Sequence, residues 1–263
     1  MSLIRITCSW LRLTTSGGLS QLLDRLDISY KRGRDYVHSP DEHYTEKLAL
    51  VEQCLQQACD NPERYVLLYQ DEFTYYRQPT LSFAYAQRGA EQPLARRSYR
   101  SNSWFRVVAV LNAVTGQVIY RQHSRIGLTQ LSDFYATVQS VYPKAETIYI
   151  VQDNWPIHFH PDVLARLQPQ YFPWPPRVPG HWSTQPRASA VKDELPIQLL
   201  SLPTYASWTN PIEKLWRWLK QEVLHLHLSA DDWPGLRQQV AAFLDRFADG
   251  SSELLRYTGL LLD

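Results

Sequence analysis

Apolar residues follow two different periods along the chain and divide it into strand-like and helix-like segments. Runs rich in β-branched and aromatic residues predict strands at 65–70, 104–112, 117–123, 147–152 and 197–201. Apolar residues at helical spacing predict helices near 19–26, 42–59, 128–141, 161–168 and 231–247. Two strands that turn at Thr115-Gly116 and are followed by parallel crossovers predict an α/β fold, a mixed sheet with helices on both faces.

The length and composition indicate one sizeable core with a small appendage. The chain has 263 residues, of which 44% are hydrophobic, and its sequence contains no membrane-spanning run, secretory signal or internal repeat. Cys8, Cys54 and Cys59 lack paired CxxC or His spacing, which indicates a reduced cytosol rather than a disulfide framework or a zinc site. The Pro-rich segment 169–196 predicts an irregular insertion.

Positive charge is unevenly spread, although the formal net charge of +1 is low for a protein that binds nucleic acid. Residues 1–40 carry six Lys or Arg against three Asp, and residues 87–106 carry five Arg against one Glu. The candidates for phosphate contacts in these stretches are Lys31, Arg32, Arg34, Arg96, Arg97 and Arg100. The alternative for each is a solvated surface side chain.

Two acidic residues directly follow predicted strands. Asp71 comes after the apolar run Tyr65 to Tyr69, and Asp153 comes after the run Ile148 to Val151. Each run is therefore expected to place a carboxylate at the C-terminal end of its strand, where open α/β sheets bind their ligands.

A third acid, Glu213, lies near the start of a predicted helix. Asn210 is expected to cap this helix, Pro211 fits its first turn, and Glu213 comes three residues after the cap. The buried stripe predicted for the helix contains Ile212, Leu215, Trp216, Leu219 and Val223. Glu213 is therefore expected beside that stripe, at the N-terminus of the helix.

Three carboxylates from distant segments can together bind two hard cations about 3.5–4 Å apart, one activating the attacking oxygen and one the leaving oxygen. The pattern thus suggests a two-metal site that cuts phosphodiesters. Each acid also has a structural alternative. An Asp after a strand is a common turn former, Asn210 with Glu213 matches a capping box, and Glu213 can pair with Arg217.

The sequences around these acids resemble the DDE transposases of the Tc/mariner superfamily and their bacterial insertion-sequence relatives. The matching motifs are DE at 71–72, DNWPIH at 153–158 and LPTYASWTNPIEKLW at 202–216, and the third is specific. The resemblance covers roughly residue 20 to the C-terminus. It maps the metal-binding acids of the family onto Asp71, Asp153 and Glu213.

The resemblance implies an RNase H-like fold and a chain divided near residue 40. Residues 1–40 would form a partial helix-turn-helix remnant and a basic linker, and residues 41–263 a catalytic domain with the Pro-rich insertion near 169–196. It also implies an enzyme that uses Mg²⁺, with Mn²⁺ as a substitute, to cleave DNA strands at transposon ends and transfer them into target DNA. The implied partners are double-stranded DNA and further copies of the chain, as a homodimer or a larger synaptic complex. The implied location is the bacterial cytoplasm, at the nucleoid and not at a membrane.

Two departures from the family pattern leave other functions open. The 59 residues 154–212 between the second and third acids exceed the usual spacing, and residues 1–40 have room for only the last part of the family's DNA-binding region. The alternatives are an inactive DNA-binding remnant of an insertion sequence and an RNase H-like nuclease without strand transfer. The short N-terminal region predicts weak DNA binding with little sequence preference.

Three further residues are candidates for supporting roles. Glu72 should point to the opposite side of its strand from Asp71, as a surface group or as a support for the site. His158 either positions a phosphate or carries a proton near the metals, or it caps the helix that begins after Pro161. Asn154 is expected to orient Asp153.

Overall fold

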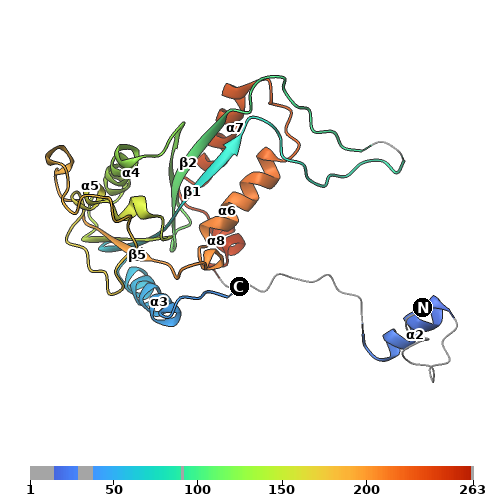
Figure 1. Ribbon diagram of the computed structural model, residues 1–263, viewed down its shortest axis with the longest axis horizontal. Coiled ribbons are helices and arrows are strands. Elements are labelled where there is room, and N and C mark those ends of the chain that lie inside the picture. Colours follow the sequence, from blue (N-terminus) through green and yellow to red (C-terminus); the bar gives the residue numbers. More distant parts are fainter. Residues whose placement is uncertain (1–14, 29–37, 90–91, 262–263) are drawn as a thin grey trace. The chain divides into compact units, whose positions relative to one another are not determined.

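The computed structural model describes residues 15–28, 38–89 and 92–261, and the chain divides into two compact units, 1–38 and 39–263 (Figure 1). In the first unit, α2 (Ser16–Arg25) confirms the helix predicted near 19–26. It begins earlier than predicted because the Thr15 hydroxyl oxygen accepts a hydrogen bond from the Gly18 amide and caps the helix. Lys31, Arg32 and Arg34 lie outside the described residues.

The second unit is built on a five-stranded mixed sheet. Its strands are β1 (Tyr65–Tyr76), β2 (Trp104–Asn112), β3 (Val118–His123), β4 (Thr147–Gln152) and β5 (Ile197–Ser201). They lie in the order β3-β2-β1-β4-β5, antiparallel from β3 to β1 and parallel from β1 through β4 to β5. The predicted hairpin, crossovers and mixed sheet are confirmed.

The first strand is longer than the predicted segment 65–70. Its parallel pairing with β4 ends at the pair Tyr69 and Val151, but its antiparallel pairing with β2 continues to Tyr76 and Trp104. The prediction that Asp71 follows the end of a strand was therefore wrong. Asp71 lies inside β1, just beyond the point where β4 stops, so a gap opens beside it along that edge of the strand.

The β2–β3 hairpin turns at Thr115-Gly116, as predicted. The Asn112 side-chain oxygen accepts hydrogen bonds from the amides of Val114 and Thr115, which closes the turn. Gly116 has a φ of +70°, and a Cβ at this position would collide with the carbonyl oxygen of Ser251. Only glycine combines this left-handed conformation with so close an approach of a second backbone.

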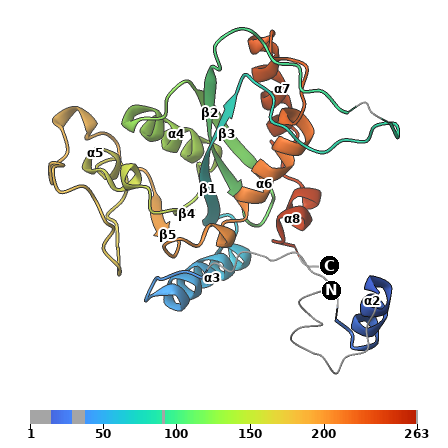
Figure 2. The same cartoon turned by 45° about the vertical axis from the view of Figure 1, so that its right-hand side comes forward.

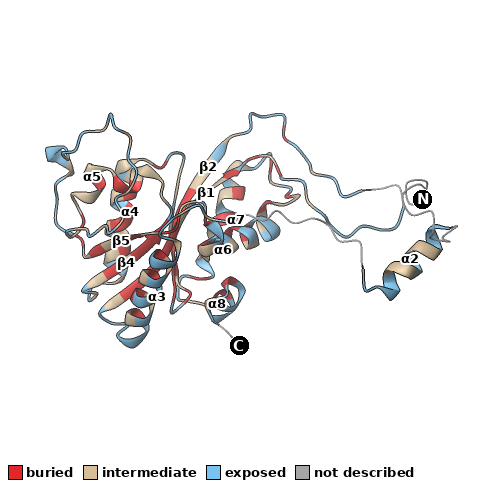
Figure 3. Ribbon diagram, turned by 60° about the horizontal axis from the view of Figure 1, so that its bottom comes forward, coloured by how far each residue is buried: buried red, intermediate tan, exposed pale blue. Residues whose placement is uncertain are grey.

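Helices cover both faces of the sheet, as predicted (Figure 2). One face packs against α4 (Leu128–Val141) and the short α5 (Pro161–Leu164). The other face packs against α3 (Tyr44–Asp60), α6 (Ile212–Leu219), α7 (Trp233–Asp245) and α8 (Ser252–Thr258). Buried residues concentrate in the strands and on the helix surfaces that face them (Figure 3). Cys54 on α3 is a small buried core residue, as expected.

Several helix bounds differ from the sequence predictions. The helix predicted at 161–168 ends at Leu164, because the chain then turns to bond with the segment before β5, where Gln168 donates to the Leu195 carbonyl. Helix α6 continues as a π-helical turn, η4 (Lys220–Leu224). Helix α8 was not predicted, since its seven residues are too few for a clear apolar period. No helix in the described ranges is long and apolar enough to cross a membrane.

Two long irregular segments leave the core of the second unit. The Pro-rich insertion contains only a short 3₁₀ turn, η2 (Ala188–Ala190), and is fastened where Arg187 binds the buried Asp162 at 2.6 Å. The segment 77–103, here called the β1–β2 arm, joins β1 to β2 and extends away from the sheet (Figure 2). Its base is held by Thr80, which exchanges backbone hydrogen bonds with Leu224 and Leu226.

Candidate active site

Asp71 is held in a fixed orientation on the face of β1 that packs against α6. One carboxylate oxygen accepts the Trp216 indole N–H at 2.9 Å, and the other accepts the Glu72 backbone amide at 2.8 Å. The Trp216 ring stacks on Phe73, two residues further along the same face of β1, with centroids 5.3 Å apart. Because the indole is itself wedged between core side chains, the carboxylate it binds has little freedom.

Asp153 directly follows β4, as predicted. Its Oδ1 atom accepts the Trp155 backbone amide at 2.9 Å, which starts the 3₁₀ turn η1 (Pro156–Phe159). Its side chain is 59% exposed, so it lies at the solvent-facing rim of the site. The turn-forming role and a cavity-lining position are therefore combined in one residue.

Glu213 lies in the first turn of α6, beside the buried stripe, as predicted. The prediction that Asn210 caps the helix was wrong, and the alternative capping box is absent, because Asn210 is buried and donates its side-chain N–H to the Gln70 carbonyl at 3.0 Å. The helix N-cap is Pro211 instead, and the Glu213 amide bonds to the backbone carbonyl of Asn210. Asn210 thus ties the start of α6 to β1, one residue before Asp71.

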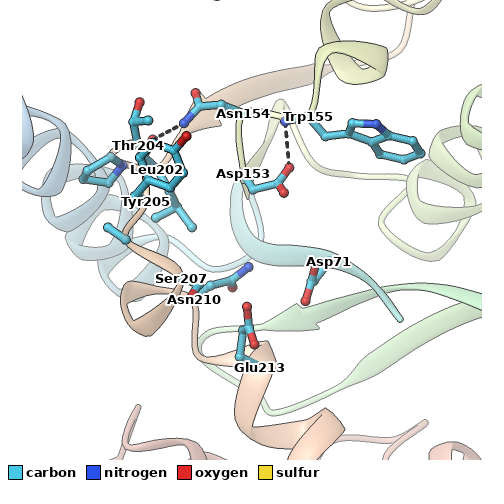
Figure 4. A pocket seen from close by; sticks show the side chains of 12 residues that line it. Asp71, Asp153, Asn154, Trp155, Leu202, Thr204, Tyr205, Ser207, Asn210 and Glu213 are labelled. Atoms are coloured by element: carbon cyan, nitrogen blue, oxygen red, sulfur yellow. Dashed lines mark hydrogen bonds between the residues drawn. The ribbon is translucent and has the colours of Figure 1, made fainter. Parts of the chain in front are cut away.

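The three acids line one cavity of about 410 Å³ (Figure 4). Asp71 enters it from β1, Asp153 from the end of β4 and Glu213 from α6, and the segment 202–207 after β5 closes another side. The gap where β4 stops beside β1 is therefore the space that these carboxylates share. Residues separated by more than 140 positions in the sequence meet here.

Negative charge in this cavity is poorly neutralised. Burial, reinforced by the charges of Glu72 and Glu213, raises the pKa of Asp71 to about 8. Burial also raises the pKa of Glu213; Lys220 and Arg217 lower it and Asp153 raises it further. Like charges in a desolvated site favour protonation unless a cation is present.

The donor set fits a hard divalent cation such as Mg²⁺ or Mn²⁺, because it consists of carboxylate oxygens. Within the described part of the chain, no three His, Cys, Asp or Glu side chains already stand close enough together to hold a metal ion. The acids therefore line the cavity in an open arrangement. The exposed Asp153 side chain lies at the rim of this arrangement.

The supporting residues predicted from the sequence have different positions. Glu72 points to the face of β1 opposite Asp71, as predicted, and lies 3.6 Å from the ring of His158. His158 is buried and does not cap the helix after Pro161; that role belongs to His160, whose ring nitrogen accepts the Asp162 amide. Asn154 donates to the Leu202 carbonyl, so it links the ends of β4 and β5 rather than orienting Asp153.

Two contacts of the site were not predicted from the sequence. Trp216 was assigned to the buried stripe of its helix, which is correct, but its indole N–H also serves Asp71. Asn210 was assigned to a cap, and its bond to β1 joins residues 140 positions apart. The local pattern around each residue is the same whether or not the distant partner exists, so the sequence carries no signal for either contact.

Three of the arginines predicted to contact phosphate lie on the β1–β2 arm. Arg96, Arg97 and Arg100 are exposed there. The arm also exposes large apolar side chains: Leu81, Phe83, Tyr85, Leu94 and Tyr99. The arm therefore presents both charge and apolar surface to a partner.

Residues 66–234 match the DDE superfamily endonuclease family, which is more than half of the chain. The chain belongs to this family. The matched segment contains all three predicted acids and the three motifs around them.

The individual relatives are distant. The Insertion element IS630 uncharacterized 39 kDa protein of Shigella sonnei is 19% identical over 224 residues, which are 85% of this chain and 57% of that protein. This chain thus spans little more than half the length of that relative.

Solved structures with a similar fold include complexes of the Mos1 transposase. The Mos1 transposase paired-end complex with left transposon end has a TM-score of 0.58 at 14% identity, over 94% of this chain and 67% of that one. The Mos1 strand transfer complex has a TM-score of 0.56 at 15% identity, over 94% and 66%. The RNase H-like mixed sheet is confirmed, and with it the resemblance to Tc/mariner-type DDE transposases.

Proposed function

We propose that this chain is a transposase catalytic domain that cleaves DNA strands at transposon ends and joins the freed 3′ ends to target DNA. In this proposal, Asp71, Asp153 and Glu213 bind two Mg²⁺ ions, or Mn²⁺ in their place. The observation that carries it is the shared cavity, which three carboxylates line from separate elements. Their unneutralised charge, seen in the raised pKa of Asp71, is what a cation would relieve.

Each acid has a distinct task in this proposal. Bound divalent cations would activate the attacking oxygen and stabilise the leaving oxygen of the phosphodiester. Asp71, held by Trp216, provides the rigid wall of the site, and Glu213 provides the opposite wall from the first turn of α6. Asp153 completes the coordination from the exposed rim of the cavity, through the carboxylate oxygen that the Trp155 amide leaves free.

The DNA partner is supported by the charged arm and by the similar fold of the Mos1 transposase paired-end complex, which contains a transposon end. We propose that Arg96, Arg97 and Arg100 contact phosphates, with Lys31, Arg32 and Arg34 of the N-terminal segment 1–40 adding further contacts. Such contacts position DNA without reading its sequence. Replacing the three arm arginines by Ala should flatten the salt dependence of binding in a gel-shift titration; an unchanged slope would exclude them.

The cleavage proposal is tested by nicking of a plasmid that carries the transposon end, with Mg²⁺ or Mn²⁺. Asp71→Asn, Asp153→Asn and Glu213→Gln should each lower the rate by roughly 10³-fold, about 4 kcal/mol of transition-state stabilisation. Glu146→Gln is the matched control, because Glu146 pairs with Arg64 in an exposed ion pair and does not line the cavity. Nicking at the wild-type rate by any of the three acid variants would refute the assignment.

Strand transfer separates a transposase from a nuclease with the same site. A pre-cut transposon end with a free 3′-hydroxyl should become covalently joined to a target plasmid, and the three acid variants should lose this product together with nicking. Nicking without any joined product would instead favour an RNase H-like nuclease. Neither activity in the folded wild-type chain would favour an inactive remnant.

A further inference from the structure

A second group of polar side chains lies buried on the face of the sheet opposite Asp71 and Glu213. It is formed by alternate residues of β1, Gln70 and Glu72, together with His158 from η1. Only 1% of Gln70 and of His158 is exposed. We call these three residues the buried polar cluster. Burying polar groups is costly unless each has a hydrogen-bond partner. The contacts among these residues therefore indicate how each side chain is oriented.

The hydrogen-bond partners fix the orientation of the Gln70 amide. Its Nε2 atom lies 3.0 Å from Glu72 Oε1, and a carboxylate can only accept, so the amide nitrogen must face it. The same nitrogen lies 3.5 Å from His158 Nδ1. Both hydrogens of a side-chain amide donate, so Nδ1 acts as an acceptor and the proton of the imidazole is on Nε2.

The protonated Nε2 of His158 then faces two carboxylates at once. It lies 3.6 Å from Glu72 Oε2 and 3.6 Å from Asp153 Oδ1. Both separations exceed a hydrogen bond, and a shift of a few tenths of an ångström would form one with either oxygen. His158 is thus a buried donor placed between an acid of the cluster and an acid of the cavity.

The Asp153 carboxylate has two unequal oxygens as a result. Oδ1 already accepts the Trp155 amide and is also the oxygen that faces His158. Donors on the protein side therefore occupy Oδ1 and leave Oδ2 as the oxygen available to the cavity that Asp153 lines. A ring edge contact with Trp155, with centroids 5.5 Å apart, keeps the imidazole plane in place.

We propose that His158 is a positioning residue, which donates to Asp153 Oδ1 and so presents Oδ2 to a divalent cation, while Gln70 and Glu72 hold the imidazole in the required tautomer. This inference rests on the proposed function, since it needs a cation in the cavity. Residues that orient a metal-ligating side chain commonly change metal affinity by roughly 10–100-fold when removed.

Two substitutions of His158 separate this role from simple packing. His158→Asn keeps a polar atom near Nδ1 for Gln70 but does not reach Asp153, whereas His158→Gln extends a donor to the place of Nε2. The affinity for Mn²⁺ alone is measured on the full chain by the loss of the free-ion signal in electron paramagnetic resonance. Circular dichroism melts establish whether each variant folds.

We expect His158→Asn to weaken Mn²⁺ binding by roughly 10–100-fold and His158→Gln to restore most of it. Equal affinity in both variants, whether retained or lost, would overturn the positioning role, and so would an Asn variant that fails to fold. Asp153→Asn separates the positioning role of His158 from the proposed metal site. If it weakens Mn²⁺ binding and His158→Asn does not, only this inference fails; if Asp153→Asn has no effect, the proposed metal site fails as well.

Discussion

The two faces of β1 place their acids in different surroundings. On the α6 face, Asp71 and Glu213 line the same cavity, and the pKa of both is raised. On the α4 and α5 face, Glu72 accepts a hydrogen bond from the Gln70 amide and lies 3.6 Å from the His158 ring. Because successive side chains point to opposite faces of a strand, β1 places Asp71 on one face and Glu72 on the other.

This difference separates acids that a cation would stabilise from an acid that already has a partner in the protein. Carboxylates that are satisfied by neighbouring donors need no further partner, whereas carboxylates whose ionisation is suppressed by burial and like charge are stabilised by a cation. Asp153 stands between the two faces, with one oxygen toward His158. The side chains proposed to orient Asp153 thus lie on one side of the sheet, and the carboxylates with raised pKa lie on the other.

Among the tests of this difference between the two faces, Trp216→Phe is expected to have the largest effect. The substitution keeps an aromatic ring to stack on Phe73 but removes the N–H that binds Asp71 at 2.9 Å. Because that donor fixes the orientation of a proposed metal ligand, the affinity for Mn²⁺ and the nicking rate should fall by roughly 10–100-fold. Isothermal titration and the plasmid assay measure the two quantities.

Trp218→Phe is the matched control. Trp218 is on the same helix but packs against Phe243, Phe247 and Tyr257, away from the acids. Trp218→Phe should lower the free energy of unfolding without changing the affinity for Mn²⁺. If the two variants lose metal affinity equally, the indole of Trp216 matters only for packing.

A smaller effect is expected on stability and its dependence on pH. Asp71 has a pKa of about 8 in the folded chain against 3.8 normally, so the unfolded chain loses this proton first as the pH rises. The free energy of unfolding should therefore fall between these two values and level off above about 8. Asp71→Asn removes this loss and should be more stable than the wild type at pH 8 by about 1–3 kcal/mol.

Thermal and urea melts at several pH values without metal measure this difference, which should shrink toward pH 4. Saturating Mg²⁺ should stabilise the wild type at pH 8 and leave the variant nearly unchanged, because a ligand that binds only the folded state adds stability. A variant less stable than the wild type at pH 8 would show that Asp71 is ionised and well satisfied without a cation.

Most of the strands and helices were predicted from the sequence, because they depend on local patterns. The β1 run, the Gly116 turn and the helix stripe of α6 each follow from neighbouring residues. The end of β1 does not follow from neighbouring residues, since it depends on how far β1 continues to pair with β2 after its pairing with β4 stops. Asp71 was therefore placed wrongly, at a strand end instead of inside a strand.

The contacts that refine the site were beyond the sequence for the same reason. Trp216 and Asn210 fit a buried stripe and a cap on local grounds, and their bonds to β1 join residues 145 and 140 positions apart. His158 fitted a cap because Pro161 follows it closely, yet the fold turns it inward toward Glu72. Such contacts cannot be predicted from the local sequence, because the packing of the sheet determines which distant residues meet.

The central claim, that Asp71, Asp153 and Glu213 share divalent cations, is tested most directly by anomalous diffraction from crystals of the chain with Mn²⁺ and transposon-end DNA. The account predicts two anomalous peaks about 3.5–4 Å apart inside the cavity, with oxygens of all three acids bound to them. It also predicts that Asp153 Oδ2, rather than Oδ1, is the coordinating oxygen. Saturating Mn²⁺ without any peak in this cavity, or with peaks only elsewhere, would contradict the account.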